Sequence, residues 1–213
     1  MSGKQAVIAV LAVMMSVLSS SAVAQDEKNE ITGIVGRIFI SDQGIQGPNA
    51  PPVNPFVRSG NGLTFEVNYA HLFLGNPIYA VYGEVPAVFN LNEKLNSGAN
   101  VVPQDYKQIF ITPSVRVNLF PGTAVSPWVS VGGGFGRFSE NNNLIYGGKN
   151  PGSSSTTGVM QGGFGLDVKV LHRFSIRGEV RDFWSGTPNL PLADTGKTRQ
   201  HNFLVGGGVV WHF

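Results

Sequence analysis

The sequence predicts an all-β protein, an eight-stranded antiparallel up-and-down transmembrane β-barrel. Three observations predict it: apolar and polar residues alternate with a period of two, long and short connections alternate along the chain, and few residues are charged. Only 13% of the 213 residues are charged and 28 are glycine, against roughly 25% charged residues in an ordinary soluble domain. The 14 Phe, 5 Tyr and 3 Trp exclude a disordered chain, and the absence of cysteine excludes a disulfide-stapled fold. A net charge of +2 is too small to indicate nucleic-acid binding.

A secretory signal peptide is predicted at the N-terminus. A basic start, Met1–Lys4, precedes the apolar run Ala6–Leu18, and an A-x-A cleavage site ends at Ala24. This run is too short for a membrane-spanning helix, which needs about 20 apolar residues. The chain is therefore expected to divide into a cleaved signal peptide over residues 1–24, a short periplasmic segment over residues 25–30 and the barrel over residues 31–213.

Alternation with a period of two is the signature of a β-strand, and it is clearest over Leu63–Ala70, Gln108–Leu119 and Phe174–Arg181. Together with weaker stretches, it predicts eight strands over residues 31–41, 62–73, 78–90, 105–119, 126–139, 157–170, 173–184 and 199–213. Many of these strands exceed the usual 5–6 residues or so of soluble strands, and they match the roughly 9–11 residues that cross a bilayer at a tilt.

The predicted connections alternate strictly in length. The long ones cover residues 42–61, 91–104, 140–156 and 185–198, and the short ones cover residues 74–77, 120–125 and 171–172. The short ones have turn residues such as Gly75 and Pro77, whereas the long ones are polar. An even number of strands places both chain ends and all short turns on one side, which is the layout of outer-membrane barrels with periplasmic turns and longer extracellular loops.

One face of the predicted strands is nearly all apolar, and the other holds charges among Gly, Ser, Thr, Asn and Gln. A soluble barrel would show a dense Lys/Glu face to water, so we favour an apolar face toward lipid and a polar lumen. The predicted lumen charges are Arg37, Glu66, Glu84, Arg116, Arg177, Glu179 and Arg181, with Asp167 and Lys169 on the same face. Because buried charges need partners, we expect the glutamates to be compensated by the arginines. An interior plug is favoured over a polar path because an eight-stranded bore is narrow.

The C-terminal strand supplies the one specific motif, with Val209, Trp211 and the terminal Phe213 alternating along it. Together with the signal peptide and the loop layout, it resembles the small outer-membrane β-barrel proteins of Gram-negative bacteria, the OmpA/OmpX-like group. The resemblance implies that the terminal aromatic is recognised by the barrel assembly machinery. It also implies an integral outer-membrane location with periplasmic termini, surrounded by outer-membrane lipids and lipopolysaccharide. Unlike OmpA, the chain is expected to lack the periplasmic peptidoglycan-binding domain.

His201 is the one histidine for which the sequence suggests a chemical role. The predicted last hairpin places it opposite Asp182, on the outward face near the extracellular rim and close to Trp184. Such a pair loosely resembles part of the active site of outer-membrane lipid A deacylases, which also use a serine, and Ser139 and Ser185 are the candidates. The alternative is an ion pair at the membrane interface beneath the aromatic belt.

Three functions therefore remain open at the level of sequence. The first is a structural or surface-interaction barrel that acts through its four long polar loops. The second is a narrow channel for ions or small solutes, and the third is a lipid A-modifying hydrolase that uses His201 and Asp182. No metal-binding, P-loop or nucleophile-elbow motif is present in the sequence, so no metal or cofactor is expected. We expect a monomer.

Overall fold

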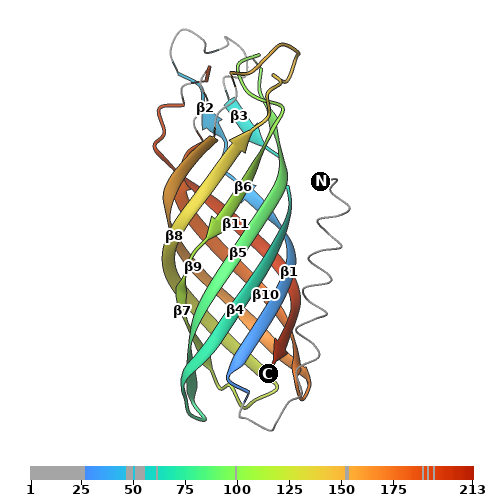
Figure 1. Cartoon of the computed structure of the whole chain (residues 1–213), viewed down its shortest axis with the longest axis vertical. Helices are drawn as coiled ribbons and strands as arrows, with labels where there is room; N and C mark the ends of the chain where they lie inside the picture. The colour runs from blue at the N-terminus through green and yellow to red at the C-terminus, as the bar shows by residue number, and fades with distance from the viewer. Residues whose placement is uncertain are drawn as a thin grey trace.

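The computed structural model is a closed antiparallel β-barrel with tilted strands (Figure 1). It describes residues 27–46, 50, 56–60, 62–98, 100–151, 154–188, 190, 192–193 and 195–213. The predicted signal peptide and its cleavage site lie outside these residues. Within them, no helix is long and apolar enough to cross a membrane.

Eight strand positions form the ring, as the sequence predicts. They are β1 (Asn29–Ile40), β4 (Leu63–Gly75), β5 (Tyr79–Asn96), β6 and β7 (Asp105–Ile111 and Ser114–Leu119, which share one position), β8 (Val125–Glu140), β9 (Ser154–Leu171), β10 (Phe174–Gly186) and β11 (Arg199–His212). Each strand pairs with its neighbours in the chain, and β11 pairs with β1 to close the ring. The first long connection contains two further short strands, β2 (Gln43–Gly44) and β3 (Phe56–Ser59), where the sequence predicts only loop.

The predicted strand over residues 105–119 is interrupted at Thr112 and Pro113. Proline has no backbone N–H to donate to a neighbouring strand. The wall is nevertheless held together, because the Thr112 amide donates to the Pro86 carbonyl at 3.2 Å and the Gly133 amide donates to the Pro113 carbonyl at 3.1 Å.

The seam between β1 and β11 closes the barrel. The two strands pair from Glu30 opposite His212 to Ile40 opposite Asn202. At the end of the seam, Asn29 and Phe213 exchange two backbone hydrogen bonds of 3.0 and 2.9 Å. Because β1 already begins at Asn29, the predicted barrel boundary at residue 31 is two residues late, and Glu30 lies within the barrel wall.

The two ends of the barrel differ. The short connections at residues 76–78, 120–124 and 172–173 lie together with the C-terminus at one end, here called the turn end. The long connections at residues 41–62, 97–104, 141–153 and 187–198 belong to the other end, the loop end, where β2 and β3 also lie (Figure 1). The predicted alternation of long and short connections is therefore present.

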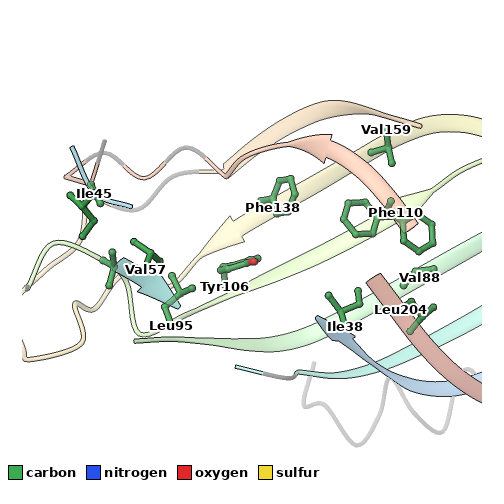
Figure 2. Packing of buried hydrophobic residues seen from close by; sticks show 13 residues of the cluster. Ile38, Ile45, Val57, Val88, Leu95, Tyr106, Phe110, Phe138, Val159 and Leu204 are labelled. Atoms are coloured by element: carbon green, nitrogen blue, oxygen red, sulfur yellow. The ribbon is translucent and has the colours of Figure 1, made fainter. Parts of the chain in front are cut away.

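The half of the lumen next to the loop end is filled by an apolar cluster, here called the apolar plug (Figure 2). Its members are Ile38, Ile45, Val57, Val88, Leu95, Val102, Tyr106, Phe110, Phe138, Val159, Phe183, Ala193 and Leu204. Phe110 stacks on Phe183 with ring centroids 5.0 Å apart and meets Phe138 edge-on at 5.9 Å. The sequence predicts a polar lumen, so the apolar plug is a correction. Inward apolar side chains are few on any one strand, but those from several strands gather near the loop end.

Candidate functional site

The half of the lumen next to the turn end holds a buried charge network. It comprises five carboxylates and three guanidinium groups, namely Glu30, Glu66, Glu84, Asp167, Glu179, Arg116, Arg177 and Arg181. These side chains come from β1, β4, β5, β7, β9 and β10, so the network ties together most of the ring. Charges buried this deeply are stable only when they are paired and hydrogen-bonded.

Arg181 is the centre of one half of the charge network. Its Nε lies 3.1 Å from Glu179 Oε1 and 3.5 Å from Glu66 Oε1, and its Nη1 donates to Glu84 Oε1 at 2.8 Å. One cation thus serves three carboxylates. Neither oxygen of Glu66 accepts a hydrogen bond from a described residue. Arg181 is therefore the counter-ion on which this cluster depends.

Arg116 and Arg177 form the other half. Arg177 makes a two-pronged contact with Asp167, donating from Nε at 2.6 Å and from Nη2 at 2.7 Å, and its Nη2 lies 3.6 Å from Glu30. Arg116 donates to Glu30 and lies 3.8 Å from Glu84, which connects the two halves. Two-pronged arginine–carboxylate pairs are strong and directional, so they fix the neighbouring strands in register.

Trp128 lies among the three arginines. The guanidinium carbons of Arg116, Arg177 and Arg181 are 5.9, 5.1 and 5.0 Å from its ring centroid. A cation over an indole face is stabilised by the ring quadrupole, and this contribution grows when water is excluded. Trp128 therefore helps to stabilise three like charges that lie close together.

The structure places six of the seven predicted lumen charges inside the barrel and moves one outside. Arg37 is exposed on the outer face with Val35 and Phe39, because it pairs with Leu63 and Val205, which both point outward.

Glu30 belongs to the charge network although it is not among the predicted lumen charges. Glu30 lies two residues before Thr32, so continuing the alternation of β1 by one period would have placed Glu30 in the lumen. Asp167 was placed on the correct face but without a partner. Trp128 is uncharged and was therefore not among the predicted lumen residues.

A cavity of about 150 Å³ opens at the turn end and reaches the charge network. His212 lines it, with Nδ1 3.4 Å from Glu30 Oε1 and Nε2 3.0 Å from Ser175 Oγ. Among the described residues, no group of three or more His, Cys, Asp or Glu side chains is arranged to hold a metal ion. The cavity reaches the network members Glu30 and Asp167, and the apolar plug follows farther along the axis.

His201 and Asp182 do meet on the outer face, although in a different register from the predicted one. Trp184 pairs with His201 and Asp182 pairs with Phe203, so the two residues are diagonal neighbours rather than opposite one another. His201 Nδ1 lies 2.6 Å from Asp182 Oδ2. The imidazole is stacked between Trp184, at 6.2 Å and 21°, and Phe203, at 5.8 Å and 10°.

Neither predicted serine joins this pair. Ser185 is buried on the lumen side and donates to the Gly186 carbonyl at 2.8 Å. Ser139 lies on β8, which β9 separates from β10. Within the described part of the chain, no hydroxyl group is hydrogen-bonded to His201.

Two residues of the predicted assembly signal, Val209 and Trp211, lie on β11, and Phe213 follows its last residue. Val209 is exposed on the outer face, and the rings of Trp211 and Phe213 stack with centroids 4.7 Å apart. Phe213 also carries the backbone pair with Asn29, so the terminal residue completes the ring.

Comparison with known proteins agrees with this architecture. The family described as "Outer membrane protein beta-barrel domain" matches residues 9–213. Neisserial surface protein A (NspA) is similar in structure, with a TM-score of 0.56 and 13% identity over 87% of this chain and 97% of that one. OprG from Pseudomonas aeruginosa also has a TM-score of 0.56, with 12% identity over 89% of this chain and 97% of the other. No curated protein matches the sequence.

Proposed function

Because the chain belongs to the outer-membrane protein β-barrel family, we propose that it is an integral outer-membrane barrel with a structural or surface-interaction role. In this proposal the turn end and both termini face the periplasm, and the four long connections face the outside and make the contacts. The observation that carries the proposal is the filled lumen: a buried charge network and an apolar plug follow one another along the bore. The loop end is then the part of the molecule left to interact with other surfaces.

The filled lumen also argues against the alternative function of a narrow channel. A narrow channel needs a continuous hydrated path, but the largest side chains of the bore, including Arg116, Trp128, Phe110 and Phe183, are fully buried. Small eight-stranded barrels have room for side chains and little else. Surface interaction is therefore favoured over transport.

A hydrolase is not favoured by the His201–Asp182 pair. Nucleophilic catalysis of this type needs a hydroxyl within hydrogen-bond reach of the imidazole, and neither Ser139 nor Ser185 is placed there. The aromatic rings on both sides of His201 favour an interfacial pair in the aromatic belt. We expect mass spectra of lipid A from cells with the wild-type gene, with His201→Ala and without the gene to be identical. A lipid A species lost in both the variant and the gene deletion would revive the hydrolase hypothesis.

The proposed orientation can be tested with single cysteines, since the chain has none of its own. Lys149→Cys places a thiol in an exposed long connection at the loop end, and Gly122→Cys places one in an exposed turn with no neighbouring atom within 4 Å of the added Cβ. A membrane-impermeant maleimide added to intact cells should label the first variant and leave the second unlabelled until the cells are lysed. The opposite pattern would overturn the proposed orientation, and no labelling of either variant in lysed membranes would argue against insertion.

A further inference from the structure

A groove of about 440 Å³ crosses the outer face where β1, β4 and β5 approach the loop end. Its main lining residues are Arg37, Gly60, Leu63, Phe65, Leu91 and Lys94. Gly60 is held against β5 at the groove, where its amide donates to the Lys94 carbonyl at 2.7 Å. Arg37 on β1 and Lys94 on β5 both line the groove, and β4 lies between these two strands, so two cations border a depression on the barrel wall.

The other side of the same groove is apolar. Leu63 and Leu91 are 54% and 55% exposed, and both continue the apolar outer surface of the barrel. Beyond Leu91, the outward residues of β5 are Asn92, Lys94 and Asn96, which are all polar. The groove therefore lies at the upper edge of the apolar band, where lipid chains end and headgroups begin.

A second cavity, of about 400 Å³, adjoins the groove, and Lys94 lines both. Its other polar lining residues include Asn96, Gln104 and Asp105, and Tyr146 contributes an aromatic ring that is 66% exposed. Tyr146 is fixed in place because its hydroxyl donates to the Ser97 carbonyl at 2.7 Å and its amide donates to Asn100 Oδ1 at 3.0 Å. An exposed aromatic face beside amide and carboxylate groups suits the apolar faces and hydroxyls of a sugar ring.

We propose that the groove and the adjoining cavity together bind one phosphorylated glycolipid of the outer leaflet. Its acyl chains lie on Leu63, Phe65 and Leu91, and its phosphate lies between Arg37 and Lys94. Its sugar reaches the cavity beside Tyr146. The inference rests on the proposed orientation, because only that orientation places the loop end in the leaflet that carries such lipids. The charge complementarity favours a phosphate, and the apolar rim favours a phosphate that belongs to a lipid rather than one free in solution.

The proposal is tested with the refolded barrel in detergent micelles, by native mass spectrometry with lipid A as the probe. Diphosphorylated lipid A should bind the wild type. The double variant Arg37→Gln with Lys94→Gln should bind it at least about tenfold more weakly, because each Lys or Arg near an anionic lipid surface adds to the attraction and the variant lacks two of them. The matched control, Lys169→Gln with Lys197→Gln, removes two exposed cations from other places and should bind within about twofold of the wild type. Dephosphorylated lipid A should bind the wild type as weakly as diphosphorylated lipid A binds the double variant.

Further measurements distinguish the reasons for which the proposed binding could fail. Inorganic phosphate in millimolar excess should not displace the lipid, and displacement would show that the site takes free phosphate instead. Tyr146→Ala should weaken binding of lipid A but leave binding of phosphatidylglycerol, which has no sugar, unchanged. Equal binding by the wild type and the double variant would overturn the inference. Heat-modifiable migration in gels reports folding of every variant, and maleimide labelling reports orientation, so a failure of the proposed function is recognised separately.

Discussion

At the scale of single residues, the charge network depends more on its cations than on any one carboxylate. Arg181 is the shared partner of Glu66, Glu84 and Glu179, so its removal leaves three buried carboxylates with too little positive charge. We predict that Arg181→Gln lowers the free energy of unfolding by about 3–5 kcal/mol, the usual cost of breaking a buried ion pair. Urea unfolding of the barrel in lipid vesicles measures this loss.

Two controls make this prediction specific. Arg37→Gln removes the same chemical group from the exposed outer face and should cost less than about 1 kcal/mol. Glu179→Gln should also cost less than Arg181→Gln, because Arg181 keeps Glu66 and Glu84 as partners. If Arg37→Gln and Arg181→Gln shift the urea midpoint equally, the lumen network is not a dry ion-pair cluster.

Glu93 gives a residue-scale prediction about pH. It lies on β5 beyond Leu91, above the apolar band, where its Oε2 accepts hydrogen bonds from the Gly62 amide at 3.1 Å and from Asn90 at 2.7 Å. Burial raises the pKa of Glu93 from 4.5 to about 7. The folded protein therefore holds this proton after the unfolded chain has released it, and the stability contribution of Glu93 falls as pH rises from 4.5 to about 7.

Glu93→Gln removes this titration. The free energy of unfolding of the variant, relative to that of the wild type, should therefore rise between pH 4.5 and 7.5. At roughly 1.4 kcal/mol per pKa unit, the relative gain is on the order of 3 kcal/mol. The measurement is the urea midpoint of both proteins at several pH values in this range. A difference between the two proteins that does not change with pH would show that Glu93 titrates normally in the folded state.

At the scale of elements, close approach of strands at the β1–β11 seam requires glycine. A Cβ at Gly208 would fall on the Gly33 carbonyl oxygen, whereas the nearest atom to a Cβ at Gly207 is the Arg177 carbonyl oxygen at 3.5 Å. We predict that Gly208→Ala lowers the free energy of unfolding by about 1–3 kcal/mol, as overpacking does elsewhere. Gly207→Ala, one residue away on the outer face, should leave the urea midpoint nearly unchanged. Equal effects of the two substitutions on the urea midpoint would mean that β1 and β11 can move apart at Gly208 without loss of stability.

The terminal strand makes a prediction about assembly. Phe213 pairs with Asn29 and stacks on Trp211, so its deletion removes both the last backbone pair of the seam and the terminal aromatic. We expect the deletion to lower the amount of folded protein in outer-membrane fractions and to leave unfolded protein in the periplasm. Immunoblots of fractionated cells, with heated and unheated samples, measure both pools. Wild-type levels of the heat-modifiable form would contradict a role of Phe213 in assembly.

The elements also show how far the sequence could predict the structure. The period-two pattern was sufficient for eight strand positions and for the facing of most residues. It did not predict the interruption at Pro113, because alternation continues on both sides of it. Arg37 was assigned to the lumen on its charge, although the alternation of β1 places it with Val35 and Phe39. The His201–Asp182 contact was found through a register two residues in error, since diagonal neighbours on a sheet lie within reach of long side chains.

At the scale of the whole molecule, the lumen is divided into two layers with different chemistry. The charge network lies toward the turn end, and the apolar plug lies toward the loop end (Figure 2). An ion entering from the turn end meets paired charges and then a layer in which apolar side chains surround a few buried polar groups, such as Gln108 and Asn202. The two layers oppose passage in series, so opening one of them does not by itself open the bore. This arrangement was not predictable from the pattern of single strands, because it depends on which inward residues reach the same level once the strands are staggered around the ring.

The two-layer lumen predicts the electrical behaviour of the protein. The wild type, refolded and inserted into a planar lipid bilayer, should show no stepwise conductance above that of a protein-free bilayer. The double variant Phe110→Ala with Phe183→Ala removes the stacked pair of the apolar plug and should remain non-conducting, because the charge network still fills the bore below it. Each truncation of a buried phenylalanine costs about 3–5 kcal/mol, so heat-modifiable migration must first show that the variant is folded. Conductance in the folded double variant alone would mean that the charge network does not close the bore, and conductance in the wild type would favour the channel hypothesis over the surface-interaction barrel.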